Sequence, residues 1–215
     1  MAGTVSSPPR AFALAKDTRK LRVERSRRWR QDPGEADNTL MERIQGGDQR
    51  AFGLLLERYW PTLAAYVAGV VEGLDAADDI LQMAFIRLWQ HRHDWTGSGS
   101  LRSYLFRIAR NLALNAQRDR SADARRNEGF RQVLAHSRGP PTPEDNLAAE
   151  RLREEVEAAI GNLPERRREV FVLARFHGLS QREIGEVLGI APQTVANQMR
   201  SALAELRDTL SHHLG

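Results

Sequence analysis

The 215-residue sequence contains no cysteine, which excludes disulfide bonds, thiolate metal sites and cysteine nucleophiles, so packing must hold the fold together. It also lacks a run of roughly 20 apolar residues, the length that a membrane-spanning helix needs. The basic start has no apolar block of the kind that a secretion signal carries. From these absences we expect a cytoplasmic protein without membrane insertion.

Aromatic residues are also scarce, at 7% of the chain, and no stretch alternates between apolar and polar residues as a half-buried strand would. Leu, Ala and Val supply much of the 41% apolar content, which favours an all-α fold. Thirty-two Lys and Arg against 28 Asp and Glu give a net charge of +4. The basic excess is rich in Arg, which indicates either a phosphate-bearing partner or ordinary solvation of the surface.

Apolar residues recur at steps of three and four between residues 38 and 119, as Phe52, Leu55, Leu56 and Tyr59 do. Glycine-containing breaks at residues 46–47, 73 and 96–100 separate these sets. The segment 38–119 is therefore predicted to be a bundle of about four helices.

The rest of the chain divides by composition. Residues 1–37 combine Ser and Pro with a basic run and have little periodic apolar surface, which predicts a flexible arm. This arm either attracts nucleic acid non-specifically or is dispensable. Residues 120–148 are interrupted by glycine and prolines and are predicted to be a flexible linker. Helical spacing resumes over residues 149–212, so we expect two small helical domains.

The clearest local motif, near the C-terminus, predicts a helix-turn-helix. Ser180 stands three residues before Glu183, and this spacing forms a capping box at the start of a short helix. Gly189 allows the left-handed turn that follows, and Pro192 suits the first turn of the next helix. Gly185 lets the two helices cross closely. The alternative is a pair of helices that merely pack together.

The last helix is predicted to bury one face and to offer the other to DNA. Val195, Met199, Leu203, Leu206 and Leu210 recur at helical steps and should be buried. The free face begins with side chains that reach base edges and phosphates. These are Gln193, Thr194, Asn197, Gln198 and Arg200.

Residues 101–118 form a second candidate surface, directly after a small-residue loop at 95–100. A helical wheel predicts that Arg107, Arg110, Asn111 and Arg118 point away from the apolar stripe. A small-residue loop beside a cationic helix suits single-stranded bases, although a solvated face is the simpler interpretation of this helix taken alone.

The preceding helix should also present a mixed surface. Asp79, Met83, Ile86 and Gln90 share a stripe opposite the buried one, and exposed apolar residues among polar ones indicate a protein-binding surface. Burial of this stripe within a larger bundle is the alternative.

Several stretches resemble extracytoplasmic-function sigma factors of the sigma-70 family. Residues 78–89, DDILQMAFIRLW, and 100–111, SLRSYLFRIARN, resemble region 2 of that family. Residues 163–166, 178–184 and 194–195 resemble region 4. The matches stand in the family's order and separation, and together cover about residues 38–119 and 149–210.

The resemblance implies an alternative sigma factor that directs promoter recognition, DNA melting and transcription initiation. Its implied partners are promoter DNA and the beta and beta-prime subunits of core RNA polymerase, with an anti-sigma factor as a further partner to consider. Region 2 would dock on the polymerase clamp and capture melted minus-10 bases, and region 4 would read the minus-35 duplex. The linker would thread through the polymerase interior.

Site residues follow from the same resemblance. Core polymerase binding is assigned to Asp79, Gln82, Met83, Phe85 and Ile86. Minus-10 DNA binding is assigned to Trp95, Gly97, Ser98, Ser100, Arg102, Arg107, Arg110 and Asn111. Minus-35 DNA binding is assigned to Ser180, Gln181, Arg182, Pro192, Gln193, Thr194, Asn197, Gln198 and Arg200. The chain departs from the family at Met83, where an acidic residue is usual, in the glycine-serine loop, and at Ala191, where a Ser or Thr cap is usual.

Two other functions account for less of the sequence. A stand-alone transcriptional regulator of the LuxR type shares the pattern of residues 179–195 but leaves residues 38–119 unexplained. An enzyme such as a metal-dependent nuclease has little support, because His91 and His93 have no carboxylate partners at ligand spacing and His212 and His213 lie in the tail. We therefore predict no enzymatic activity, no metal and no cofactor.

Overall fold

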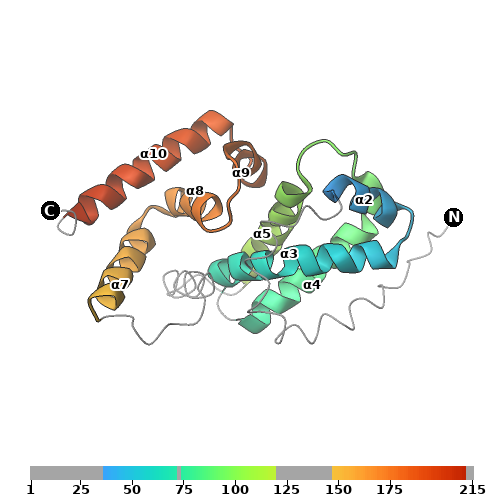
Figure 1. The fold of residues 1–215 in the computed structure, drawn as a ribbon, viewed down its shortest axis with the longest axis horizontal. Coiled ribbons are helices and arrows are strands. Elements are labelled where there is room, and N and C mark those ends of the chain that lie inside the picture. The colour runs from blue at the N-terminus through green and yellow to red at the C-terminus, as the bar shows by residue number, and fades with distance from the viewer. Residues whose placement is uncertain (1–35, 72–73, 120–146, 212–215) are drawn as a thin grey trace.

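The computed structural model describes residues 36–71, 74–119 and 147–211, which are helical apart from short turns and contain no strand (Figure 1). The prediction of an all-α fold with two helical domains is confirmed for these residues. The predicted arm at 1–37 and linker at 120–148 lie outside the described residues, except for their edges.

The N-terminal domain consists of four α-helices and one short 3-10 helix among the described residues. They are α2 (Asp37–Gln45), α3 (Gln49–Val70), α4 (Leu74–Gln90), η1 (Arg92–Asp94) and α5 (Leu101–Asp119). The C-terminal domain consists of α7 (Leu147–Asn162), α8 (Glu165–Arg175), α9 (Gln181–Leu188) and α10 (Pro192–Thr209).

The turn between α2 and α3 follows from local chemistry. Gly47 adopts a positive φ of 87° that side-chain-bearing residues rarely take, as the predicted break at residues 46–47 requires. Asp48 then caps α3 by accepting hydrogen bonds from the backbone N–H groups of Arg50 (2.8 Å) and Ala51 (3.1 Å). The side-chain hydrogen bond from Arg43, followed by that from the Ala51 N–H, lowers the pKa of Asp48 below its usual range.

Aromatic side chains join the helices of the N-terminal domain. The ring of Phe85 on α4 stacks on Trp60 of α3, with centroids 5.8 Å apart, and meets Phe52 edge-on at 6.3 Å. Phe52 also contacts Trp89, at 5.1 Å. All four rings are buried, so α3 and α4 form the centre of this bundle.

The last helix buries a slightly different stripe from the predicted one. Val195 and Leu206 are buried as expected, but Leu203 is exposed and Ala202 is fully buried in its place. At 3.6 residues per turn, position 202 continues the stripe of residues 195, 199 and 206, whereas position 203 lies beside it. The prediction for Leu203 was wrong. Leu203 is the larger apolar residue but lies beside the stripe, whereas the small Ala202 lies within it.

The two domains share one continuous hydrophobic core. Buried residues of α5, including Leu105 and Phe106, belong to the same cluster as Leu173 of α8 and Ile184 of α9. In Figure 1, α9 lies directly against α5, with α7, α8 and α10 on its other side. The sequence predicted two tethered domains, and it did not predict that they pack against each other.

Candidate nucleic-acid interface

Local sequence signals determine the bounds of α9 and the start of α10 as predicted. Ser180 Oγ accepts from the Glu183 backbone N–H (3.2 Å), and the Glu183 carboxylate accepts from the Ser180 backbone N–H (2.9 Å), which completes the capping box at the start of α9. Gly189 ends α9 with a φ of 66°, and Pro192 occupies the first turn of α10. The predicted helix-turn-helix is therefore confirmed.

Gly185 allows the tight approach within this motif. A Cβ atom at this position would lie 2.7 Å from the backbone carbonyl oxygen of Ile190 and 3.6 Å from the backbone nitrogen of Pro192. Backbone atoms at such a distance cannot move aside as a flexible side chain does, so only glycine fits between α9 and the turn into α10.

The tip of α10 presents polar side chains to solvent. Gln193, Thr194, Asn197 and Arg200 are exposed, together with Pro192, whereas Gln198 is half-buried. The Asn197 Oδ1 atom accepts hydrogen bonds from Gln193 Nε2 (3.3 Å) and Arg200 Nη1 (3.1 Å).

The start of α10 also favours an anion. Its N-cap residue, Ala191, makes no side-chain hydrogen bond to the helix, Pro192 has no N–H, and the Thr194 N–H donates to the Ala191 carbonyl (2.9 Å), so the Gln193 N–H is the first-turn donor that a side-chain cap leaves unsatisfied. This N–H group, with the positive end of the helix dipole, suits a phosphate.

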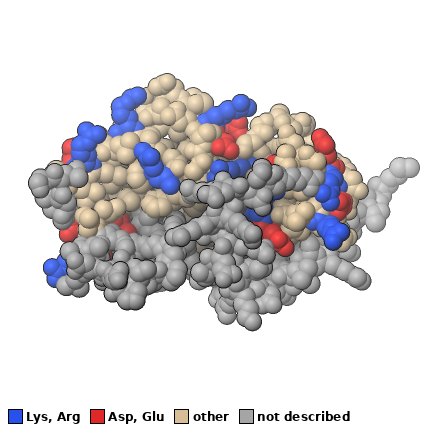
Figure 2. Space-filling model, viewed as in Figure 1, with Lys and Arg blue, Asp and Glu red and all other residues tan. Residues whose placement is uncertain are grey.

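The remaining predicted duplex-binding residues lie at the start of α9. Ser180, Gln181 and Arg182 are all exposed, and the Arg182 guanidinium forms an ion pair with Glu186 at 3.2 Å. Figure 2 shows Arg side chains at several separate places over both domains rather than in one patch, with acidic side chains beside several of them.

The loop before α5 is shaped by glycine. Gly97 and Gly99 have φ values of 73° and 96°, in the left-handed region. The Trp95 ring packs on Tyr104 of α5, with centroids 5.4 Å apart, and the Trp95 carbonyl accepts a hydrogen bond from Gln45 Nε2 (2.7 Å). The loop is thus anchored at Trp95, while Gly97 and Ser98 remain exposed.

The predicted minus-10 residues of α5 and the loop divide into two groups. Arg107 and Asn111 are exposed, as the helical wheel predicted, and the Arg107 guanidinium lies over the Tyr104 ring at 5.6 Å. Ser100, Arg102 and Arg110 instead face the C-terminal domain. The prediction that Arg110 points to solvent was wrong, because the wheel considers one helix alone and takes no account of a second domain packed against it.

Arg110 forms an ion pair with Glu169 of α8. Its Nη2 atom donates to Glu169 Oε2 at 3.0 Å, and its Nε atom donates to Oε1. Only 15% and 16% of the two side chains are exposed. Burial by itself lowers the pKa of Arg110, but the hydrogen bond and charge of Glu169 raise it overall, so the guanidinium stays charged. Tyr66 Oη also donates to Glu169, at 3.2 Å.

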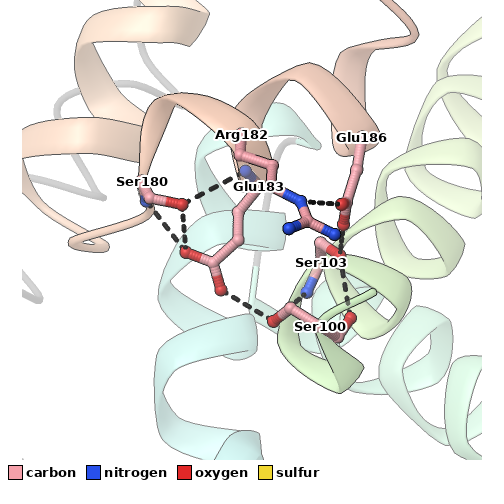
Figure 3. Close-up of polar contacts among 6 residues, drawn as sticks. All are labelled: Ser100, Ser103, Ser180, Arg182, Glu183 and Glu186. Atoms are coloured by element: carbon pink, nitrogen blue, oxygen red, sulfur yellow. Dashed lines mark hydrogen bonds and ion pairs between the residues drawn. The ribbon is translucent and has the colours of Figure 1, made fainter. Parts of the chain in front are cut away.

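Two further hydrogen bonds connect α9 with the start of α5 (Figure 3). Ser100 Oγ donates to Glu183 Oε1 at 2.7 Å, and the buried Ser103 donates to Glu186. Burial raises the pKa of Glu183, but hydrogen bonds from Ser180 and Ser100 and the charge of Arg102 outweigh this effect, so its pKa lies below the usual range. Glu183 therefore accepts these bonds as a carboxylate at neutral pH.

His177, in the turn before α9, is buried where the domains meet. Its ring packs against the contacting rings of Tyr66 (5.5 Å) and Phe106 (5.6 Å), and its Nε2 atom has no hydrogen-bond partner within the part of the chain that the structure describes. Arg102 donates to the backbone carbonyls of His177 and Gly178, the latter at 3.2 Å. Burial, with the charge of Arg102, lowers the pKa of His177 to about 3.

We define the interdomain contact as these polar groups. Tyr66, Ser100, Arg102, Ser103 and Arg110 form its N-terminal side, and Glu169, His177, Glu183 and Glu186 form its C-terminal side. Sequence reasoning missed Tyr66 and Ser103 and, as site residues, all four on the C-terminal side. Their partners lie 59 to 103 residues away, so no local spacing connects them.

The predicted polymerase-binding residues of α4 also divide. Met83 is 46% exposed, Asp79 is exposed, and Gln82 and Ile86 are half-buried. Phe85 is fully buried among Phe52 and Trp60 and has no exposed surface in this structure, and its assignment to polymerase binding stays a prediction. Phe85 packs inside the N-terminal domain, whereas Met83 lies on a different, exposed face of α4.

Neither a metal-ligand cluster nor a membrane-spanning helix is found among the described residues. Within residues 36–71, 74–119 and 147–211 no group of three or more His, Asp and Glu side chains is arranged to hold a metal ion. His91 does have a carboxylate partner, contrary to the sequence reasoning, since its Nδ1 atom lies 2.8 Å from Asp94 Oδ2 on the exposed surface. None of the described helices combines the length and apolar character of a membrane span.

Comparisons with known proteins connect both domains with one family. Residues 55–122 match the profile of sigma-70 region 2, and residues 153–206 match that of sigma-70 region 4. The ECF RNA polymerase sigma-E factors of Haemophilus influenzae and Escherichia coli are 31% and 34% identical over 170 residues, which is 76% of this chain and 89% and 88% of theirs.

Solved structures give the same result for the fold. CnrH in complex with the cytosolic domain of CnrY matches with a TM-score of 0.60 at 28% identity, over 83% of this chain and 99% of CnrH. The sigma factor RpoE in complex with the anti-sigma factor NepR, from Bartonella quintana, matches with a TM-score of 0.54 at 21% identity, over 74% of this chain and 96% of RpoE.

Proposed function

This chain belongs to the extracytoplasmic-function group of the sigma-70 family, and we propose that its two helical domains divide promoter recognition between melted DNA and duplex DNA. It is an alternative sigma factor that binds RNA polymerase and directs transcription initiation. The observation that carries this conclusion is the presence of regions 2 and 4, in order, on one chain. We propose domain bounds of 38–119 and 149–212, with an arm at 1–37 and a linker at 120–148.

The C-terminal domain is proposed to read the minus-35 duplex with the tip of α10. Gln193, Thr194, Asn197 and Arg200 are exposed side chains of the kinds that hydrogen-bond to base edges, and the start of the helix favours a phosphate. Ser180, Gln181 and Arg182, at the start of α9, would contact the phosphate backbone of the DNA.

The N-terminal domain is proposed to capture the melted minus-10 strand with α5 and the loop at 95–100. Arg107 and Asn111 are exposed, and the loop offers backbone groups at Gly97 and Ser98 beside the Trp95 ring. Cationic side chains beside a small-residue loop and an aromatic ring suit single-stranded bases. Ser100, Arg102 and Arg110 would complete this surface, although the C-terminal domain contacts all three in the structure.

The exposed face of α4 is proposed to dock on the beta and beta-prime subunits of the polymerase. Met83 supplies an exposed apolar side chain, and Asp79 supplies a charge beside it. An apolar residue with polar neighbours is typical of a protein interface. We further propose that the chain acts in the cytoplasm, that an anti-sigma factor restrains it, and that it has no enzymatic activity, metal or cofactor of its own.

In vitro transcription tests this function. Purified core polymerase, with and without this chain, is incubated with a library of genomic promoter fragments, and the transcripts are mapped. We expect specific start sites only when the chain is present. Specific binding of the chain to a palindromic duplex as a dimer, without any start site in the presence of polymerase, would favour a LuxR-type regulator instead.

A further inference from the structure

The side chain of Gln45, the last residue of α2, connects this helix with the loop that is proposed to hold the melted strand. Its Nε2 atom donates to the backbone carbonyl of Arg92 at 3.0 Å and to that of Trp95 at 2.7 Å. An amide nitrogen carries two hydrogens, so one side chain satisfies both carbonyls. The acceptors lie 47 and 50 residues further along the chain, so the two bonds attach η1 and the start of the loop to a separate helix.

Gln45 stands on a firmly held part of the N-terminal domain. The apolar side chains of α2 are fully buried in the core of that domain, and they are Leu40, Met41 and Ile44. The turn after the helix is closed by the Asp48 backbone N–H, which donates to the Arg43 carbonyl at 3.0 Å, and by an ion pair of the two side chains at 2.8 Å. A side chain on such a fixed element can determine the position of a neighbouring loop.

The other end of the loop is held by the first turn of α5. The Ser100 carbonyl accepts hydrogen bonds from Ser103 Oγ (2.8 Å) and from the Tyr104 backbone N–H (3.1 Å). Residues 96–99, which are exposed, lie between this carbonyl and that of Trp95. Because this span is short, the positions of its two ends restrict the path of the exposed residues.

Gln45 also acts on the cationic face of α5 through Trp95. The Trp95 ring packs on Tyr104, with centroids 5.4 Å apart, and the Arg107 guanidinium lies over the Tyr104 ring at 5.6 Å. Aromatic rings beside a cation are the groups on which single-stranded bases stack and to which their phosphates bind. The carbonyl that Gln45 holds belongs to Trp95, so the hydrogen bond fixes the backbone from which this ring extends.

We propose that Gln45 is a positioning residue for the minus-10 strand, because its two hydrogen bonds orient the loop at 95–100 and the Trp95 ring for base selection. The proposal rests on the function proposed above, and it assigns a role to a residue outside the loop and α5. Gln45 is half-buried and donates its amide hydrogens to the protein, so it acts through the loop rather than by contact with DNA.

Base selection by the full chain with core polymerase tests this role. Gln45→Met keeps the approximate length of the side chain and removes both donors. Gln49→Met is the matched control, because Gln49 is an exposed glutamine at the start of α3. Permanganate reactivity measures opening of a promoter that the native chain recognises, and of versions with single-base substitutions in its minus-10 element. The quantity compared is the ratio of opening on the native element to opening on each substituted element.

We expect Gln45→Met to lower this ratio by roughly tenfold at the most selective minus-10 position, because two ordinary hydrogen bonds no longer hold the loop. Gln49→Met should keep the native ratios. A residue that only stabilised the fold would lower opening of every promoter in the same proportion and leave the ratios unchanged. Native ratios in Gln45→Met would therefore overturn the proposal.

A measurement on the free chain reports the position of the loop directly. The chain contains four tryptophans, which can be replaced by fluorotryptophan, and Trp95→Phe identifies the fluorine resonance of Trp95. In Gln45→Met this resonance should move, while that of the buried Trp60 should stay in place. Gln45→Glu, which keeps the side-chain shape but places carboxylate oxygens against two carbonyls, should give the same change. An unmoved Trp95 resonance in both variants would show that Gln45 does not hold the loop.

The two proposals fail separately. If the native chain opens no promoter with core polymerase, the proposed function fails, and the fluorine resonances still decide whether Gln45 fixes Trp95. If the native chain opens promoters and Gln45→Met selects the same bases, the positioning role is wrong and the proposed function stands.

Discussion

Acidification should destabilise the packed domains through His177. The ring is 2% exposed, and its pKa is lowered to about 3 from an ordinary value of 6.5. Between these two values the unfolded chain binds a proton that the folded chain does not, so folded stability is fully present above pH 6.5 and falls as the pH drops toward 3. One pH unit below 6.5 should cost about 1.4 kcal/mol of the free energy of unfolding.

Urea unfolding between about pH 7.5 and 5.5, followed by tryptophan fluorescence and circular dichroism, measures this loss. Asp48 and Glu183 also have lowered pKa values, but their ordinary values are 3.8 and 4.5, so their contributions are lost mainly below this window. The effect within the window should therefore come largely from the histidine.

His177→Phe tests the assignment directly. A phenyl ring suits the space beside the Tyr66 and Phe106 rings and removes a buried Nε2 atom that lacks a partner among the described residues. The free energy of unfolding of the His177→Phe variant should change little between about pH 7.5 and 5.5. His177→Asn is a polar control that does not titrate either. If both variants lose as much stability as the native chain does, the reasoning from His177 is refuted.

Four further predictions follow from the site and the fold. Arg200→Ala should weaken binding by about 1 to 3 kcal/mol at one minus-35 base pair if it reads a base, or weaken all sequences alike if it touches phosphate, as promoter competition measures. Arg107→Ala with Asn111→Ala should slow promoter opening, and normal permanganate reactivity would count against these residues. Met83→Lys, which puts a cation where the family usually has an acidic residue, should loosen polymerase binding, and an undiminished pull-down would place the docking face elsewhere. Gly185→Ala should destabilise the C-terminal domain by about 1 to 3 kcal/mol, because its Cβ meets the Ile190 carbonyl, and an unchanged melting temperature would contradict this.

The helix-turn-helix was predictable because its signals are local. The Ser180–Glu183 box, the left-handed Gly189 and the first-turn Pro192 each depend on neighbours within a few residues. The two helical domains were predictable for the same reason, since apolar spacing within one helix indicates which face is buried.

The interdomain contact could not be predicted in this way. Arg110 and Glu169 are 59 residues apart, and nothing in either local sequence identifies the other as its partner. The burial of Phe85 could not be predicted for a related reason, because a resemblance indicates which helix docks but not which side of that helix is turned inward. Long-range packing decides both questions.

The side-chain oxygen of Asn197 accepts hydrogen bonds from Gln193 on one side and Arg200 on the other. A single acceptor atom therefore orients two side chains about two turns apart on α10, one on each side of Asn197. Replacing Asn197 releases both at once, so preferences at the base pairs that these two side chains contact should shift together. During divergence of related factors, promoter preference would then change in blocks rather than one base at a time.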